Sequence, residues 1–418
     1  MGLDAETEPR AVREQPAPPA RPPAVCPAPR GPLSTLADLS RGPVGLLVAV
    51  ALVTVQVIVN YHVGEISDLK SLYFAHGLAH DPVPYVDVRI EYPVLIGLFM
   101  TGAAAITHGV HDYLIVSSVG LWVCAAGSTC ALWSFSRRAA WCFALSPLLL
   151  VYSLLNWDML AIFLMLLGWL AWRRDRHATA AALMTLGVFT KLYPVFLLFF
   201  CGVALVRRRR DGLASQRDLM RFGGATLGTA AIVNVPFMIL AFHNWSYFWT
   251  FNSNRTEHAD LLSWLGPLEH APASTANDVL AAVIAVSVAI GVRAIWRRGS
   301  PVHVTAVTFF VYMVFQKVNS PQYTLWLVVF AGLDGWELWT IVALSLMGLI
   351  DYANAAIHIQ IVKRHDGGLD YWYVQHFYAN DQGVRLVTTI VALVATVARR
   401  DLGWPARAGS ESTGDDRQ

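Results

Sequence analysis

The chain has 418 residues, of which 55% are hydrophobic and only 14% charged, with a formal net charge of +2. Soluble domains carry roughly a quarter charged residues, so this composition excludes an ordinary soluble protein and predicts a polytopic membrane protein. No nucleic-acid partner is expected. Of the 5 cysteines, Cys26 lies in the N-terminal tail and the others lie inside apolar runs, which gives no disulfide framework.

The two ends of the chain differ in composition from the region between them. Residues 1–42 are rich in Pro, Ala and Arg and lack the apolar patterning of a folded unit, which predicts a disordered cytoplasmic tail. This stretch is too long and too Pro-rich for a secretory signal. Residues 399–418 are predicted to form a second disordered cytoplasmic tail, which leaves 43–398 as a transmembrane domain.

Apolar segments follow one another closely through this domain, so the predicted fold is an all-α helix bundle in lipid. To match the basic turns, either 91–107 or 113–134 should not fully span. A re-entrant 91–107 is the first interpretation, because this segment is short and begins with Tyr92-Pro93, and it leaves about twelve true spans. Several segments are shorter than a straight span, and such helices are tolerated where they line a water-filled cavity. The segments run roughly over 43–62, 91–107, 113–134, 139–155, 157–172, 178–192, 193–206, 222–242, 278–296, 304–318, 323–334, 335–353 and 384–398.

Clusters of arginine predict the orientation of the bundle. By the positive-inside rule they face the cytoplasm, so both termini are expected inside a plasma membrane, with the functional site outside. The clusters are Arg137-Arg138, Arg173 to Arg176, Arg207 to Arg210, Arg297-Arg298 and Arg399-Arg400. Outer loops are expected near 63–90, 156, 192, 243–277, 319–322 and 354–383.

Ionisable residues gather in or beside these outer loops, and they are candidates for a functional site because such groups are costly near lipid. Asp68 follows the first span, where it could act as a general base or could be an interfacial acid paired with Lys70. Asp87, Arg89 and Glu91 share one face if their segment is extended. They could pair with one another, or Arg89 could meet a phosphate while a carboxylate orients an acceptor.

Two lysines interrupt apolar sequence beside proline-containing outer turns. Lys191 and Lys317 could each extend to the interface, but together they are better explained as counter-charges for an anionic head group at the membrane surface. The loop expected to start at His243 mixes aromatics with amides. Within it, Asn252 suits a sugar and Arg255 suits the phosphate of that sugar.

No cofactor motif stands out. The 13 histidines show no metal-ligand spacing, and the chain has no Walker loop, dinucleotide-binding glycine turn or G-x-S-x-G elbow. No structural metal and no nucleotide cofactor are expected, while a divalent metal in the reaction stays open.

Several short motifs, in their order along the chain, resemble glycosyltransferase family 87. They are Ser67 to Tyr73, Pro84-Tyr85, Glu91-Tyr92-Pro93-Val94-Leu95, Asn156-Trp157-Asp158, Lys191-Leu192-Tyr193-Pro194 and Ser320-Pro321-Gln322-Tyr323. The resemblance extends over about 43–398 and departs from the common Tyr-Pro-Pro-Leu form by having Val94. This family belongs to the GT-C superfamily and includes actinobacterial α-mannosyltransferases that use polyprenol-phosphate-mannose, and arabinofuranosyltransferases of the cell envelope.

The resemblance implies an inverting enzyme that moves a sugar from a polyprenyl-phosphate donor to a glycolipid or glycan acceptor of the cell envelope, at the outer membrane face. Mannose is the first expectation for the sugar and arabinofuranose the alternative. By position, the implied base is Asp68. The expected substrate-binding residues are Asp87, Arg89, Glu91, Tyr92, Asn156, Asp158, Lys191, Tyr193, Asn252, Arg255, Lys317 and Gln322.

Two other interpretations compete with the transferase. A transporter or flippase of lipid-linked sugars would also place polar residues inside a helix bundle, along its substrate path. It would, however, predict charged groups on both faces, whereas the inner side shows only the arginines that set the orientation. A structural membrane protein would leave the paired lysines and the acidic first loop unexplained.

Overall fold

The computed structural model describes residues 42–64, 67–255, 260–268, 270–318, 320–364, 367–374 and 379–401. The regular secondary structure of these residues is helical, joined by turns and irregular segments, with one isolated bridge between Pro84 and Val88. The predicted tails lie outside the described residues at 1–41 and 402–418. The last helix extends to Asp401, slightly beyond the expected end of the transmembrane domain.

Five helices of 21 to 26 residues are long and apolar enough to cross a membrane. At about 1.5 Å per residue they measure about 30 to 40 Å, which matches or exceeds the hydrocarbon core of a bilayer. They are α2 (Pro43–Val63), α5 (Val110–Trp133), α11 (Gln216–Leu240), α14 (Ala273–Trp296) and α17 (Leu338–Lys363). The chain therefore fits a polytopic membrane protein, and the expected count of about twelve spans stays a prediction.

Shorter helices form the centre of the bundle. In α16 (Tyr323–Leu333), every residue from Thr324 to Gly332 is buried, so protein surrounds this helix on all sides. It packs against α15 (Pro301–Phe315), α17 and α6 (Arg137–Ala144), while α8 (Asp158–Arg173) packs between α5 and α9 (His177–Val188). In contrast, α11 and α14 bury few residues, and their apolar surface suits contact with lipid.

Three expected boundaries are wrong. The segment 139–155 is two helices, α6 and α7 (Leu149–Tyr152), because Pro147 lies between them and cannot donate a backbone hydrogen bond. The expected outer loop 243–277 contains α12 (Phe242–Asn254) and α13 (Leu261–Trp264). The expected outer loop 354–383 is helical over much of its length, through the end of α17, α18 (Gly367–Tyr373) and the start of α19 (Ala379–Asp401).

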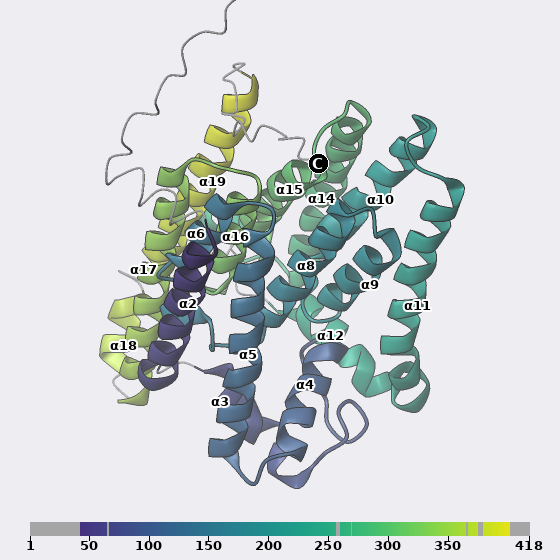
Figure 1. Cartoon of the computed structure of the whole chain (residues 1–418). Helices are drawn as coiled ribbons and strands as arrows, with labels where there is room; N and C mark the ends of the chain where they lie inside the picture. The colour runs from purple at the N-terminus through teal and green to yellow at the C-terminus, as the bar shows by residue number, and fades with distance from the viewer. Residues whose placement is uncertain are drawn as a thin grey trace, which may run out of the picture.

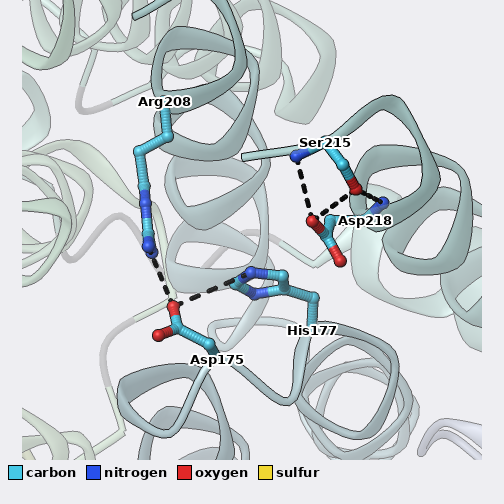
Figure 2. A network of polar contacts seen from close by, with 5 residues as sticks. All are labelled: Asp175, His177, Arg208, Ser215 and Asp218. Atoms are coloured by element: carbon cyan, nitrogen blue, oxygen red, sulfur yellow. Dashed lines mark hydrogen bonds and ion pairs between the residues drawn. The ribbon is translucent and has the colours of Figure 1, made fainter. Parts of the chain in front are cut away.

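Hydrogen bonds bring the arginine-rich turns to one end of the bundle. Arg173 donates to Phe135 O (3.3 Å), and Arg207, near the end of α10 (Val195–Arg210), donates to Ile295 O (2.8 Å). Figure 2 shows Arg208 reaching Asp175, 2.9 Å away, at the turn between α8 and α9. Beside it, Ser215 and Asp218 exchange the hydrogen bonds of a capping box that starts α11.

The opposite end of the bundle carries the predicted functional residues. Because α8, α10 and α14 all end at the basic turns, their first residues lie at the other end. Figure 1 shows α3 (Asp68–Ala75) and α4 (Val94–Ala105) at the bottom of the view, opposite the yellow end of α19 at the top. With 16 residues each, α8 and α10 are about 24 Å long, shorter than the peripheral helices. The turns that precede them are therefore recessed between longer neighbours.

Tyr85 shapes the chain where it enters α4. Its backbone has a φ of 62°, in the left-handed region, and its side chain is only 1% exposed. The Tyr85 hydroxyl donates to Tyr92 O (3.1 Å) and Pro93 O (2.9 Å), which fixes the turn before the helix. The ring lies against Gly97, where a Cβ would come within 2.6 Å of it.

We expect Gly97→Ala to destabilise the protein by about 1 to 3 kcal/mol, because the added methyl displaces the Tyr85 ring and its hydrogen bonds. The measurement is thermal unfolding of the purified protein in detergent. Gly102→Ala, on the same helix with no atom within 4 Å of the added Cβ, is the matched control and should leave stability nearly unchanged. Equal unfolding temperatures for the two variants would contradict the role of Tyr85.

Candidate active site

A cavity of about 520 Å³ lies at the end of the bundle opposite the basic turns. Its walls come from α3, the turn before α4, the α9–α10 turn, α12, α14, the α15–α16 connection and α17. The residues predicted from sequence that line it are Asp68, Glu91, Tyr92, Lys191, Tyr193, Asn252, Arg255, Lys317 and Gln322.

Hydrogen bonds tie segments around this cavity to one another. Asn60 Oδ1, near the end of α2, accepts from Leu154 N (2.8 Å) in the segment that precedes α8. Asp68 N donates to Leu155 O (2.8 Å), and Leu95 N donates to Phe189 O (2.9 Å). The first two bonds join α2, the segment before α8 and the start of α3, and the third joins the start of α4 to the end of α9.

Asp68 is the first residue of α3 and is half-buried. The Tyr92 hydroxyl donates to Asp68 Oδ2 (3.1 Å), whereas no ion pair joins this carboxylate to Lys70 among the described residues. Burial raises the pKa of Asp68, the charge of Glu91 adds to the rise, and the charge of Lys191 and the Tyr92 hydrogen bond oppose it. The result is a carboxylate in the cavity wall that is more basic than an ordinary aspartate.

Lys191 meets a second carboxylate behind the wall. Its Nζ lies 3.2 Å from Asp158 Oδ1, and the Asp158 side chain has no exposed surface. The same ammonium lies 4.4 Å from the centroid of the Tyr92 ring. Asn156, also fully buried, turns its side chain back to accept from Asp158 N (3.0 Å) and so caps the start of α8. Asn156 and Asp158 support the wall without lining the cavity.

Two further cations stand at another part of the cavity. Lys317 is 6% exposed, and its Nζ donates to Ser253 O (2.6 Å) at the C-terminal end of α12. Asn277 of α14 donates to the same carbonyl (3.0 Å). Burial lowers the pKa of Lys317, and the nearby charge of Arg255 lowers it further. Two cations placed close enough to repel each other make a favourable site for an anion.

Glu91 completes the ionisable lining. It pairs with His76 (Nε2 to Oε2, 3.0 Å). Burial acts to raise the pKa of Glu91, but the His76 hydrogen bond, with the charges of His76 and Arg255, outweighs it and lowers the pKa. In the described part of the chain, no three His, Cys, Asp or Glu side chains come together as a metal site.

The structure places Asp87 and Arg89 away from the cavity. Asp87 Oδ2 accepts from Val83 N (2.8 Å), within its own turn. Arg89 donates to His243 (2.8 Å) and to Asn244 Oδ1 (3.4 Å), and so joins this turn to α12. The three charges at 87, 89 and 91 therefore have separate partners and do not act as one face, because the left-handed Tyr85 and the following turn end the extended conformation.

Aromatic rings form the floor on the side of α16. Trp326 lies between two tyrosines: the Tyr193 ring centroid is 4.3 Å away and that of Tyr323 is 4.1 Å away, both nearly parallel. Sequence reasoning did not assign seven other polar residues of the lining to the site: Gln316, Ser320, Tyr323, Tyr152, Asn277, Tyr312 and Tyr352. The last four of these lie inside helices, where a single hydroxyl or amide does not by itself predict a binding residue.

A comparison with protein families finds that the family described as glycosyltransferase family 87 matches residues 90–321, more than half of the chain. The matched region contains Glu91, Asp158, Lys191, Arg255 and Lys317, while Asp68 precedes it. No curated protein matches the chain.

Trp326→Leu should destabilise the protein by about 3 to 5 kcal/mol, because both faces of the indole are packed and the smaller side chain leaves a void between the tyrosines. Thermal inactivation of the detergent-purified protein measures the loss. Trp339→Leu is the control, since Trp339 is 53% exposed on a lipid-facing part of α17. A similar loss of stability in both variants would show that the stacking at Trp326 does not contribute more to stability than an exposed tryptophan does.

Proposed function

This chain belongs to glycosyltransferase family 87 and is a membrane glycosyltransferase, and we propose that it transfers a sugar from a polyprenyl-phosphate donor to a glycolipid or glycan of the cell envelope. The proposal places the reaction at the outer membrane face, with inversion at the anomeric carbon and with mannose as the sugar. One observation carries it: a single cavity contains a basic carboxylate, Asp68, together with a close pair of cations, Arg255 and Lys317.

In the proposed reaction Asp68 is the general base. It takes the proton of the acceptor hydroxyl, whose oxygen attacks the anomeric carbon as the bond from that carbon to the phosphate oxygen breaks. The hydrogen bond from Tyr92 fixes the orientation of the carboxylate. Because burial raises the pKa of Asp68, its carboxylate is a stronger base than that of a solvated aspartate.

Arg255 and Lys317 are the proposed partners of the leaving group. Bond cleavage concentrates negative charge on the polyprenyl phosphate, and two cations in a partly desolvated cavity stabilise that charge more than water would. Lys317 is well placed because the Ser253 carbonyl holds its ammonium. Lys191 already forms an ion pair with Asp158. We therefore propose that it acts on the carboxylates and does not bind the phosphate.

The remaining polar lining suits a sugar and its acceptor. Asn252, Asn277 and Gln322 offer amides, and Tyr323 offers a ring and a hydroxyl, so the cavity can meet both the hydroxyls and the apolar faces of a pyranose. The cell-envelope acceptor would approach from the side of Asp68 and Glu91. Family membership favours this transferase over the transporter considered from the sequence.

Asp68→Asn should lower kcat by about 10² to 10⁴, since an amide cannot take the proton but preserves the shape of the site. The assay supplies membranes that contain the protein with radiolabelled polyprenyl-phosphate mannose, or the arabinofuranose donor, and an envelope-glycolipid extract. Asp112→Asn is the control, an exposed acid at the start of α5 outside the cavity. Full activity of Asp68→Asn would eliminate Asp68 as the base, and transfer from the arabinose donor alone would change the sugar.

The wild-type enzyme should lose activity on acidification at a higher pH than an ordinary aspartate would impose. The base works only when ionised, and burial raises the pKa of Asp68, so the acid limb of kcat/KM lies above the pH near 4 where a solvated aspartate titrates. The check is the dependence of kcat/KM on pH for the labelled donor. An acid limb at or below pH 4 would contradict the assignment.

Arg255→Gln and Lys317→Gln should each lower kcat/KM for the donor by about 10- to 100-fold, the loss of one charge-assisted hydrogen bond to phosphate. Initial rates at varied donor concentration measure the effect. Raising the acceptor concentration should not restore the rate of either variant. Lys70→Gln removes an exposed cation from α3 and serves as the control. If all three variants behave alike, the two cations do not bind the phosphate.

A further inference from the structure

The ammonium of Lys191, in the cavity wall, interacts with two carboxylates, those of Asp158 and Asp68. It is paired with Asp158 at 3.2 Å, and its charge also acts on Asp68. Lys191 lines the cavity, whereas Asp158 lies behind it with a side chain that is 0% exposed. Tyr92 connects the two sides, because its ring lies under the ammonium and its hydroxyl bonds Asp68.

The position of Asp158 is set by backbone structure. It is the first residue of α8, where a carboxylate is favoured by the helix dipole, and Asn156 caps its amide. Lys191 comes from the short turn between α9 and α10, and Thr190 and Lys191 both bond back to Gly187 O. Two rigid turns therefore hold the carboxylate and the ammonium against each other.

A fully buried carboxylate requires a partner, since an unpaired charge in a low-dielectric interior costs several kcal/mol. Lys191 is the ion-pair partner that the structure gives Asp158 among the described residues. Asp68, in contrast, is half-buried and already accepts from Tyr92, so it needs the ammonium less. The geometry agrees with this order of need, because the ammonium of Lys191 lies 3.2 Å from Asp158 Oδ1.

We propose that Asp158 is a positioning residue. It holds the Lys191 ammonium at the back of the cavity, so that Asp68 does not form a tight ion pair with it and can accept the proton. This inference rests on the proposed role of Asp68 as base. A carboxylate in a tight ion pair is a weaker base, so an ammonium that moved forward onto Asp68 would slow proton transfer.

The charged and titratable groups that face these carboxylates are few. Lys191, Glu91, Tyr92 and the amide of Asn156 act on Asp68. Lys191, Asp68 and Asn156 act on Asp158, and the nearby phenols are those of Tyr92, Tyr193 and Tyr323. Among the described residues, Lys191 is the cation whose charge acts on both Asp68 and Asp158, so the position of its ammonium decides which carboxylate it stabilises more.

Asp158→Asn and Lys191→Met should change the titration of Asp68 in opposite directions. Without the Asp158 charge the ammonium moves toward Asp68, so the acid limb of kcat/KM shifts to lower pH by about one unit and the plateau of kcat falls. Without Lys191, Asp68 loses a stabilising cation and the limb shifts to higher pH. If Lys191 instead bound the donor phosphate, its loss would raise the donor KM and leave the limb in place, which would overturn the proposal.

The double variant separates positioning from direct repulsion between the carboxylates. If Asp158 acts through Lys191, Asp158→Asn shifts the limb much less in the Lys191→Met background than in the wild type. An equal shift in both backgrounds would show that Asp158 acts on Asp68 directly, and no shift in either would make the pair structural. Asp158→Glu, which keeps the charge, should restore the limb toward its wild-type position.

Asp351→Asn is the matched control. Asp351 of α17 is also fully buried and is paired with Arg385 of α19 at 3.4 Å, but neither residue lines the cavity. Its variant should lose stability and keep the wild-type acid limb. A shift of the limb in Asp351→Asn as large as in Asp158→Asn would mean that loss of any buried pair perturbs the site, and would refute the specific role.

Infrared titration makes the test independent of turnover. The carboxylate band that disappears in Asp68→Asn reports the ionisation of Asp68 in the purified protein, and it should titrate at lower pH in Asp158→Asn even if that variant is inactive. An unmoved band refutes positioning by Asp158. Failure of the proposed function gives a different pattern, because Asp68→Asn itself would then retain full transfer activity.

Discussion

The ion pair between Lys191 and Asp158 is the contact on which the arrangement of the cavity depends. It joins the α9–α10 turn to the start of α8, where the Asp158 side chain has no exposed surface and that of Lys191 is only 10% exposed. In such surroundings each charge needs the other, so the two turns cannot move apart without a cost of several kcal/mol. The Tyr92 ring packs against the Lys191 ammonium, and the Tyr92 hydroxyl donates a hydrogen bond to Asp68. Through Tyr92 the ion pair therefore helps to fix the position of the proposed base.

Helix length explains why the cavity lies where it does. The peripheral helices α2, α5, α11, α14 and α17 are long enough to cross a bilayer, whereas the central helices α8, α10 and α16 have 16 residues or fewer. The short helices end below the level that their neighbours reach, and irregular turns complete the wall. Non-helical backbone of this kind is tolerated at membrane depth where it is buried in protein or faces a polar cavity. A recessed site of this kind suits a donor whose phosphate stays at the membrane surface.

Local pattern predicted many of the parts but few of their pairings. The apolar runs beginning at residues 43, 113, 222 and 278 became helices close to their expected bounds, because helix formation in lipid depends on local composition. Asp68, Lys191 and Lys317 stood out since ionisable residues beside apolar runs are rare. The aromatic segment after His243 was expected to be a loop but is the helix α12, whose aromatic and amide residues give little apolar periodicity.

The sequence by itself determined that this protein is a helical membrane protein, that clusters of arginine collect at one end, and that Asp68, Lys191 and Lys317 belong to the other. These properties follow from the cost of burying charge and backbone polar groups in lipid, which each segment meets locally. Only the tertiary structure decided that Lys191 pairs with Asp158, that Arg255 and Lys317 share one wall, and that Asp87 and Arg89 lie outside the cavity. These contacts join residues far apart in the chain, so they depend on how turns from separate helices pack and on which buried charge has the greater need of a partner.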